Sequence, residues 1–191
     1  MINIPQNAEL VYISFSAEIN PSTTEILINI MAECSNRNVQ KVYLLFSTSG
    51  GSVMNGINLY NVLKGMPFEL IIHNVGNIDS IGNAVFLASE QRYASSEATF
   101  MFHGVGFDSQ PQERLEQKNL EEKLNNVLSD QRRIGSIIAR HTNLNINQIA
   151  TLFKQAQTKD VKYALDRGII QDIREVQLTT GCPIISPIFK R

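Results

Sequence analysis

Short apolar runs alternate with longer amphipathic stretches along the first hundred residues of the chain. The runs are five or six residues long and rich in β-branched and aromatic residues, which is typical of β-strands. They lie at residues 10–15, 42–46 and 68–72. The run at 42–46 is almost unbroken, which predicts a strand covered on both faces.

Between these runs, apolar residues recur at the spacing of a helix. Asn20 precedes Pro21, so the chain offers an N-cap residue with proline at the first helical position. Two more helices are predicted at residues 52–64 and 81–89. Residues 91–103 then form two further strand-like runs. The repeated order of strand, strand and helix predicts an α/β domain.

A long charged pattern begins after Pro111. Residues 112–140 predict one helix, because they contain no proline and no glycine before Gly135. Its apolar stripe consists of Leu115, Leu120, Leu124, Val127, Leu128, Ile134, Ile137 and Ile138. A helix of this length is expected to project from a small domain.

The last third of the chain predicts shorter elements. Two helices are expected at residues 146–155 and 160–167, the second capped by Asp160 and ended by Gly168. Residues 169–173 predict a closing strand, and the tail from Gln177 has no clear period. We expect a single domain over residues 1–191, with a core of about 10–175 and a tail at 176–191 that has no assigned structure.

Composition narrows the function classes. The net charge of −1 disfavours nucleic acid and anionic membranes as partners. Cys34 and Cys182 lie far apart without clustered histidines, so we expect no metal, no disulfide framework and a reducing, cytoplasmic compartment. No segment approaches the ~18 apolar residues of a membrane span, and the start of the chain lacks a basic leader.

Three strand ends carry candidate chemistry. Gly50-Gly51 can present backbone N–H groups, Ser80 can act as a nucleophile, and His103 ends an apolar run and can act as its base. Each also has a structural reading, since Ser80 could be an N-cap and Gly50-Gly51 an ordinary turn.

The other two histidines are expected to be structural. His73 lies inside a strand run, and His141 ends the long helix, where a positive charge suits the helix dipole. His103 is therefore the candidate base.

Four motifs in this order resemble the proteolytic subunit of the ATP-dependent Clp protease, ClpP, a family of serine peptidases. They are Gly50-Gly51-Ser52-Val53, Ser80-Ile81-Gly82, Met101-Phe102-His103, and the long helix into His141-Thr142 with the segment 163–170. The resemblance spans about Val11 to Ile173. It implies an α/β fold of the ClpP/crotonase-like type, with stacked β-β-α units and the long helix as a projecting handle.

The resemblance also implies the site. Ser80 would be the nucleophile and His103 the general base, with the backbone N–H groups of Gly51 and Ile81 as the oxyanion hole. Gly50, Val53 and Gly104 would border an extended peptide or unfolded-protein substrate. No cofactor would be needed. Ser49 stands where the family has a proline before the glycines.

The third member of the triad departs from the family. Aligning Ile149 and Gly168 puts Leu152 where the family has an aspartate, and leucine cannot orient an imidazole. Thr151, Gln155 and Asp160 are nearby substitutes, but Asp160 is better explained as a helix cap. The resemblance therefore implies a peptidase whose activity is reduced by the missing acid.

The expected partner is a second copy of the chain. In the family the handle helix joins two stacked rings, so we expect a homo-oligomeric ring, although the same stripe could pack on its own domain. The family's longer N-terminal segment helps to dock a Clp ATPase, and only residues 1–10 precede the first strand here, which disfavours that partner.

Two other functions stay open. A non-catalytic ring or regulatory subunit is favoured by Leu152 and opposed by the presence of Ser80 and His103. A crotonase-type acyl-CoA enzyme would use a similar oxyanion hole, but neither Gly50-Gly51 nor Ser80-Ile81-Gly82 carries the glutamate that such chemistry needs.

Overall fold

One mixed sheet forms the framework of the computed structural model, which describes residues 4–107 and 116–189. Its strands are β1 (Val11–Ser16), β2 (Lys41–Thr48), β3 (Glu69–Asp79), β4 (Gln91–Ala94), β5 (Thr99–Met101), β6 (Thr158–Asp160), β7 (Asp172–Ile173) and β8 (Ile184–Ile185). The main path runs β6-β5-β3-β2-β1-β8, and β4 pairs with β3 and β7. In the described part of the chain every pairing is parallel except β5 with β6.

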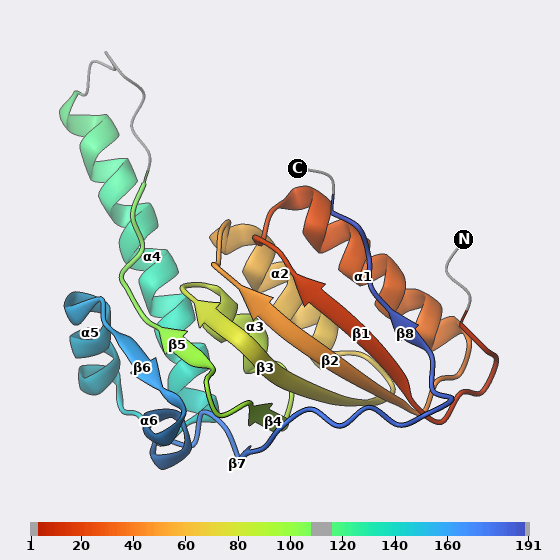
Figure 1. Ribbon diagram of the computed structural model, residues 1–191. Coiled ribbons are helices and arrows are strands. Elements are labelled where there is room, and N and C mark those ends of the chain that lie inside the picture. Colours follow the sequence, from red (N-terminus) through yellow and green to blue (C-terminus); the bar gives the residue numbers. More distant parts are fainter. Residues whose placement is uncertain (1–3, 108–115, 190–191) are drawn as a thin grey trace.

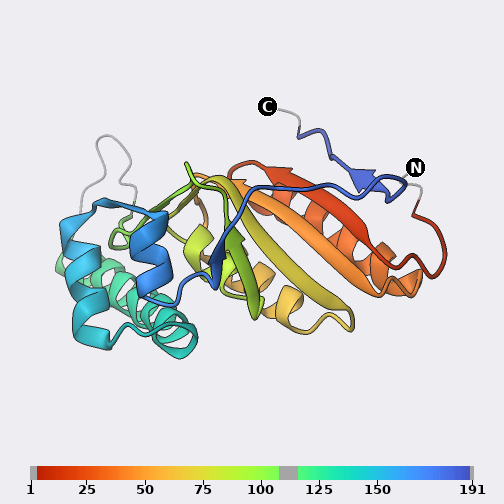
Figure 2. The same ribbon diagram turned by 60° about the horizontal axis from the view of Figure 1, so that its bottom comes forward.

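Three helices cover one face of this sheet. They are α1 (Pro21–Asn36), α2 (Val53–Lys64) and α3 (Gly82–Phe86), and Figures 1 and 2 show them on the same side. The predicted cap of α1 is confirmed, because Asn20 Oδ1 accepts from the Thr23 N–H at 3.0 Å. Ser52 caps α2, and α3 is shorter than the predicted 81–89.

The prediction that the strand at 42–46 is covered on both faces was wrong. Burial alternates along β2: Val42, Leu44 and Phe46 are fully buried, whereas Tyr43 and Leu45 are half-buried. The helices α1, α2 and α3 lie on one face of the sheet (Figure 2), and on the other face the Tyr43 ring packs beside the Tyr12 ring of β1, with the ring centroids 5.4 Å apart.

The helices of the second half of the chain gather at the β5–β6 end of the sheet (Figure 2). Here lie α4 (Gln117–His141), α5 (Ile146–Gln155) and α6 (Val161–Asp166). The amino-terminal part of α4 projects away from the sheet, as predicted, and its carboxyl-terminal part is buried at Ile134, Ile137 and Ile138 (Figure 1). Residue Leu115 of the predicted stripe lies outside the described residues.

Two features at the end of the chain differ from the sequence prediction. The closing strand β7 is only Asp172–Ile173, because the N–H groups of Ile169 and Ile170 bond back to the Ala164 carbonyl of α6. The tail, which has no periodic pattern, contributes β8, and this strand pairs in parallel with β1. The tail is therefore part of the sheet.

Candidate active site

The three candidate segments follow three adjacent parallel strands. Gly50-Gly51 follows β2, Ser80 follows β3 directly, and His103 comes two residues after β5. β2 pairs with β3, and β3 pairs with β5. Because the carboxyl ends of neighbouring parallel strands meet at one edge of a sheet, the fold gathers these segments at that edge.

Ser80 lies at a sharp turn between β3 and α3. Its φ is 56°, in the left-handed region that non-glycine residues rarely adopt. Its N–H donates to the Met101 carbonyl at 2.9 Å, which ties the turn to the end of β5. Strain of this kind persists only where the surroundings hold it in place, and it gathers at functional sites.

The side chain of Asn83, which the sequence did not single out, stabilises this turn by two hydrogen bonds. Its side chain is buried, and its amide Nδ2 donates to the carbonyls of Ser80 at 3.1 Å and Met101 at 2.8 Å. The sequence carries only a weak signal for this role, since Asn83 is a single amide residue inside a short apolar helix.

The glycine pair packs against the serine turn. Gly50 has a φ of +86°, and a Cβ there would lie 2.7 Å from Ser80 Cβ and 2.8 Å from the Asp79 carbonyl. Gly51 has a φ of +138°, and a Cβ there would overlap the Ile19 carbonyl. Glycine is thus required at both positions, because each has a positive φ and because a Cβ at either would lie too close to neighbouring atoms.

Two main-chain N–H groups beside Ser80 are left without an intramolecular acceptor. The neighbouring N–H groups of Gly50, Ser52 and Ser80 do donate to other protein atoms. Among the described residues, the N–H groups of Gly51 and Ile81 donate to none. Free donors of this kind are available to bind an anionic oxygen.

The imidazole of His103 lies exposed at the same edge of the sheet. Its Nδ1 donates to the carbonyl oxygen of Gly104 at 2.7 Å. In the described part of the chain no hydrogen bond joins His103 to Ser80. The fold brings the two residues to neighbouring strand ends without a direct bond between them.

Leu152 lies on α5 and is buried, with 5% of its surface exposed. It borders a small cavity together with Leu144, Tyr163 and Arg167. A different face of α5, with Ile149 and Phe153, borders the cavity that includes Gly104. Asp160 caps α6 by accepting from the Tyr163 N–H at 2.8 Å, as the sequence predicted.

An apolar cavity of about 550 Å³ lies next to the candidate site. It is bordered by Gly104, Leu128, Gln131, Arg132, Gly135, Ser136, Ile146, Ile149, Ala150, Phe153 and Lys154. The Gly104 N–H donates to the Phe153 carbonyl at 3.1 Å, so α5 is joined to the chain directly after His103. A cavity of this size and lining accepts an apolar side chain.

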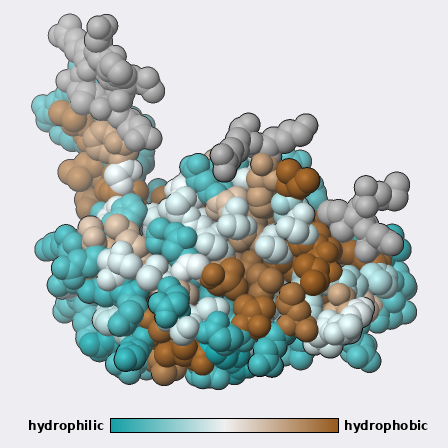
Figure 3. Space-filling view, viewed as in Figure 1, coloured by the Kyte–Doolittle hydropathy of each residue, from teal (hydrophilic) through white to brown (hydrophobic). Residues whose placement is uncertain are grey.

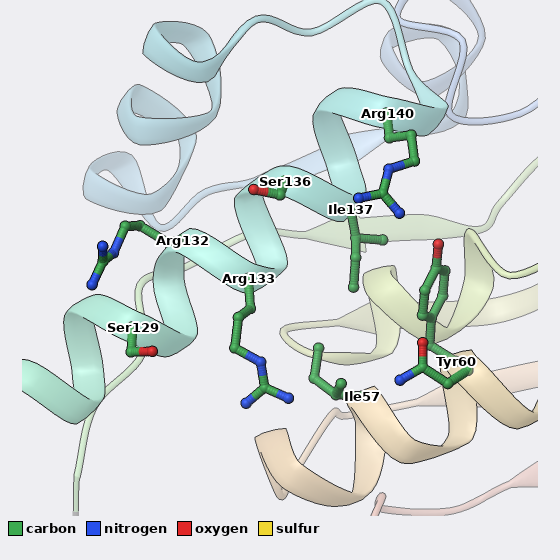
Figure 4. A pocket seen from close by; sticks show the side chains of 9 residues that line it. Ile57, Tyr60, Ser129, Arg132, Arg133, Ser136, Ile137 and Arg140 are labelled. Atoms are coloured by element: carbon green, nitrogen blue, oxygen red, sulfur yellow. The ribbon is translucent and has the colours of Figure 1, made fainter.

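A second cavity, of about 530 Å³, lies between α2 and α4 (Figure 4). Arg133 and Arg140 extend from α4 towards α2, whereas Arg132 points away from it. Arg133 is paired with Asp130 at 3.0 Å. None of the candidate catalytic residues borders this cavity.

His73 and His141 are buried, in agreement with a structural role. His73 bonds to the Tyr43 hydroxyl at 2.7 Å and to Ser95 at 3.3 Å, and burial lowers its pKa. His141 bonds to the Tyr60 hydroxyl at 2.8 Å, and burial also lowers its pKa. His141 Nδ1 also lies 3.5 Å from Glu90 Oε1.

Neither metal binding nor membrane insertion finds support in the described residues. They contain no group of three or more His, Cys, Asp or Glu side chains placed to hold a metal ion. No helix among them is long and apolar enough to cross a bilayer.

Comparison with known proteins shows the family of the chain. The sequence model of the Clp protease family matches residues 7–177. The chain belongs to the Clp protease family. The family's peptidase fold and the names of its relatives support a Clp-like peptidase.

Two curated relatives are similar to this chain over most of its length. The ATP-dependent Clp protease proteolytic subunit 1 of Leifsonia xyli subsp. xyli is 24% identical over 156 residues, which cover 80% of this chain and 75% of that protein. The proteolytic subunit of Lactococcus lactis subsp. cremoris is 23% identical over 141 residues, covering 72% and 69%. A mutant of ClpP1 from Listeria monocytogenes has a similar fold, with a TM-score of 0.73 and 21% identity over 87% of this chain and 92% of that one.

Proposed function

We propose that this Clp family member hydrolyses peptide bonds through an acyl-enzyme on Ser80. Its Oγ attacks the peptide carbonyl while His103 Nε2 takes the hydroxyl proton. The same proton passes to the leaving amine as the peptide bond breaks. Water then attacks the ester and gives one proton to His103. His103 returns this proton to Ser80 Oγ as the ester bond breaks, which releases the carboxylic acid and the free serine.

The observation that carries this proposal is the pair of free N–H groups at Gly51 and Ile81, beside a serine in a left-handed turn. They are the donors for the oxyanion of the tetrahedral intermediate. One such donor is worth ~10² to 10³ in rate in other acyl-transfer enzymes. A serine that served only as a helix cap would need no such pair of donors beside it.

The apolar cavity beside Gly104 supports an apolar side chain as the specificity element of the substrate. Its lining from α4 and α5 carries Leu128, Ile149 and Phe153, and only a few polar groups. Gly50, Val53 and Gly104 flank the site, where an extended peptide pairs with the exposed main chain. The substrate class is therefore peptides and unfolded proteins with an apolar residue before the cleaved bond.

Self-assembly is the second part of the proposal. Leu120, Leu124 and Leu128 are each about half exposed along the projecting part of α4. Figure 3 shows an apolar surface over this helix. An exposed apolar stripe on a projecting helix is typical of an interface. We infer that copies of the chain form a homo-oligomeric ring and that α4 joins two such rings face to face.

Labelling with a fluorophosphonate probe tests the activated serine. We expect the wild-type protein to be labelled, and Ser80→Ala and His103→Ala to abolish labelling. Ser129→Ala, which removes an exposed serine of α4, is the matched control and should be labelled normally. Turnover of a fluorogenic peptide with an apolar residue before the cleaved bond should follow the same order.

A non-catalytic family member is the competing function, since no hydrogen bond joins Ser80 to His103 in the described residues. An assembled, folded wild-type protein that the probe does not label would favour it over the peptidase.

A further inference from the structure

The serine and the histidine of the candidate site lie on separate strands. Ser80 follows β3 directly, and His103 comes two residues after the end of β5. The segment around the histidine is fixed on both sides, because Phe102 is buried and the Gly104 N–H donates to the Phe153 carbonyl at 3.1 Å. The distance between the two reactive side chains therefore depends on the bonds that join the Ser80 turn to β5.

One carbonyl group of β5 accepts two of these bonds. The Met101 oxygen accepts from the Ser80 N–H at 2.9 Å and from the side-chain amide of Asn83 at 2.8 Å. The same amide donates to the Ser80 carbonyl at 3.1 Å, which also accepts from the main-chain N–H of Asn83 at 3.1 Å. Asn83 therefore joins the serine turn to the strand that leads to His103.

The contacts of the Asn83 amide show that its donor group is the one in use. Two carbonyl oxygens face the same amide atom, and an oxygen there would repel both, so that atom is the nitrogen. Among the described residues, the Oδ1 atom of Asn83 is buried and has no hydrogen-bond partner. An unpaired buried acceptor is unfavourable and offsets much of what the two donated bonds contribute to folding. We therefore expect the amide to add little to the stability of the fold.

The turn that Asn83 contacts has an unfavourable backbone conformation. Ser80 has a φ of 56°, and a non-glycine residue keeps such a conformation only where surrounding bonds hold it there. Without the amide, the turn would keep its main-chain bonds but lose the side-chain link between the Ser80 carbonyl and β5. A displacement of about 1 Å at a reacting centre costs about 10² in rate, so even a small relaxation of the turn affects the nucleophile.

We propose that Asn83 is a positioning residue, which holds Ser80 Oγ where it can reach both His103 and the peptide carbonyl. Its side chain contacts neither the substrate nor the reacting atoms and acts through the main chain of Ser80 and Met101. The inference rests on the proposed peptidase function and deepens it. It assigns to a buried amide the task of setting the distance between a nucleophile and a base that lie on separate strands.

Asn74 provides a matched control for Asn83. It is buried on β3, and its amide donates to the Thr99 carbonyl of β5 at 2.9 Å. Its Oδ1 accepts from the Gly76 N–H at 3.1 Å, so this amide uses both its donor and its acceptor. Asn74 thus also bonds to a carbonyl of β5, but it lies six residues before Ser80 in the sequence.

The test compares Asn83→Ala with Asn74→Ala in the full-length protein. We expect fluorophosphonate to label Asn83→Ala at least about tenfold more slowly than the wild type, with a lower kcat and a KM for a fluorogenic peptide within about twofold. Its midpoint of urea unfolding should stay close to that of the wild type. Asn74→Ala leaves the Gly76 N–H without its acceptor, so it should lower the midpoint more and still be labelled at the wild-type rate.

Three results would overturn the inference. Asn83→Ala could be labelled as fast as the wild type, the two variants could lose labelling in proportion to their loss of stability, or Asn83→Ala could be the less stable of the two. Each result would mean that the Asn83 amide serves the fold and not the position of the nucleophile.

A second readout does not depend on activity. Hydrogen exchange at the Ser80 amide, measured by mass spectrometry, should be faster in Asn83→Ala and unchanged in Asn74→Ala, because only the first change loosens the serine turn. Unchanged exchange in Asn83→Ala would also overturn the inference. If exchange is faster only in Asn83→Ala while the probe does not label the wild type, the peptidase proposal fails and the link between the turn and β5 stands.

Discussion

At the scale of single residues, the contact between Gly50 and Ser80 leads to a direct prediction. Gly50→Ala adds a Cβ at a φ of +86°, within 2.8 Å of the Asp79 carbonyl and 3.4 Å from Ser80 Oγ. Alanine in that conformation costs on the order of 1 to 2 kcal/mol, and the serine turn must shift to make room. We expect the rate of fluorophosphonate labelling to fall at least about tenfold, because a displacement of about 1 Å in a site of this kind costs about 10² in rate.

Gly106→Ala is the matched control for this change. A Cβ at Gly106 meets no atom within 4 Å, and its φ lies outside the left-handed region. Its labelling rate should equal that of the wild type. If Gly50→Ala were labelled as fast as Gly106→Ala, the close packing of Gly50 on the serine turn would have no part in reactivity.

At the scale of elements, the exposed leucines of α4 predict how the protein assembles. Leu124 is 56% exposed on the projecting part of the helix. Leu124→Glu puts a charge into the proposed interface, where desolvation is unfavourable, and should lower the mass of the assembly measured by light scattering. Asn126→Glu adds the same charge on another side of the helix and should leave that mass unchanged. An equal effect of both changes would argue against an interface on the leucine face.

The elements also show how far sequence reasoning reaches. α1 and α5 could be predicted because local signals agree: Asn20 and Asn145 each cap a helix whose apolar spacing is clear. The short strand β8 could not, because its pairing with β1 depends on chain segments that meet only in the folded state. The run in β2 misled for a related reason, since apolar residues also occur where a face is only half-buried.

The candidate site divides in the same way. The turns at the glycine pair and at Ser80 could be predicted, because a turn after a strand has a local signature in sequence, and the catalytic roles of these residues stay predictions. The bond from His103 to Gly104 and the register of β5 with β6 could not, because they depend on pairing between distant segments. Spacing along the chain pointed to Leu152, which the structure buries beside a separate cavity.

At the scale of the whole molecule, one buried arginine joins both halves of the chain. The Arg92 side chain is 3% exposed and donates to the carbonyls of Ser89, His141, Gly168 and Ile169. Arg92→Met leaves these carbonyls without that donor, and we expect the free energy of unfolding in urea to fall by at least about 3 kcal/mol.

The matched control for Arg92 is Arg37→Met. Arg37 is about half exposed and pairs with Glu33 at 2.7 Å, so its loss should cost less than about 1 kcal/mol. Similar losses for the two changes would mean that the buried contacts of Arg92 contribute no more than an exposed ion pair.

Two buried histidines predict how the stability of the whole fold depends on pH. Burial lowers the pKa of both His73 and His141 in the folded state. In the unfolded chain both take up a proton near pH 6.5. As the pH falls below about 6.5, the unfolded state therefore binds more protons than the folded one, and the free energy of unfolding decreases. The slope approaches about 1.4 kcal/mol per pH unit for each histidine, and stability from this source is complete above about pH 7.5.

Urea unfolding between pH 5.5 and 8 of the wild type, His73→Gln and His103→Gln measures this effect. His73→Gln should be less stable than the wild type at pH 8, because glutamine does not reproduce the bonds to Tyr43 and Ser95, but it should show a shallower slope below pH 6.5. His103 is exposed, so His103→Gln should keep the slope of the wild type. Since burial disfavours the protonated imidazole of His73 between these two hydroxyls, acid lowers the stability of the sheet around it. Equal slopes for the wild type and His73→Gln would place the pH dependence elsewhere in the molecule.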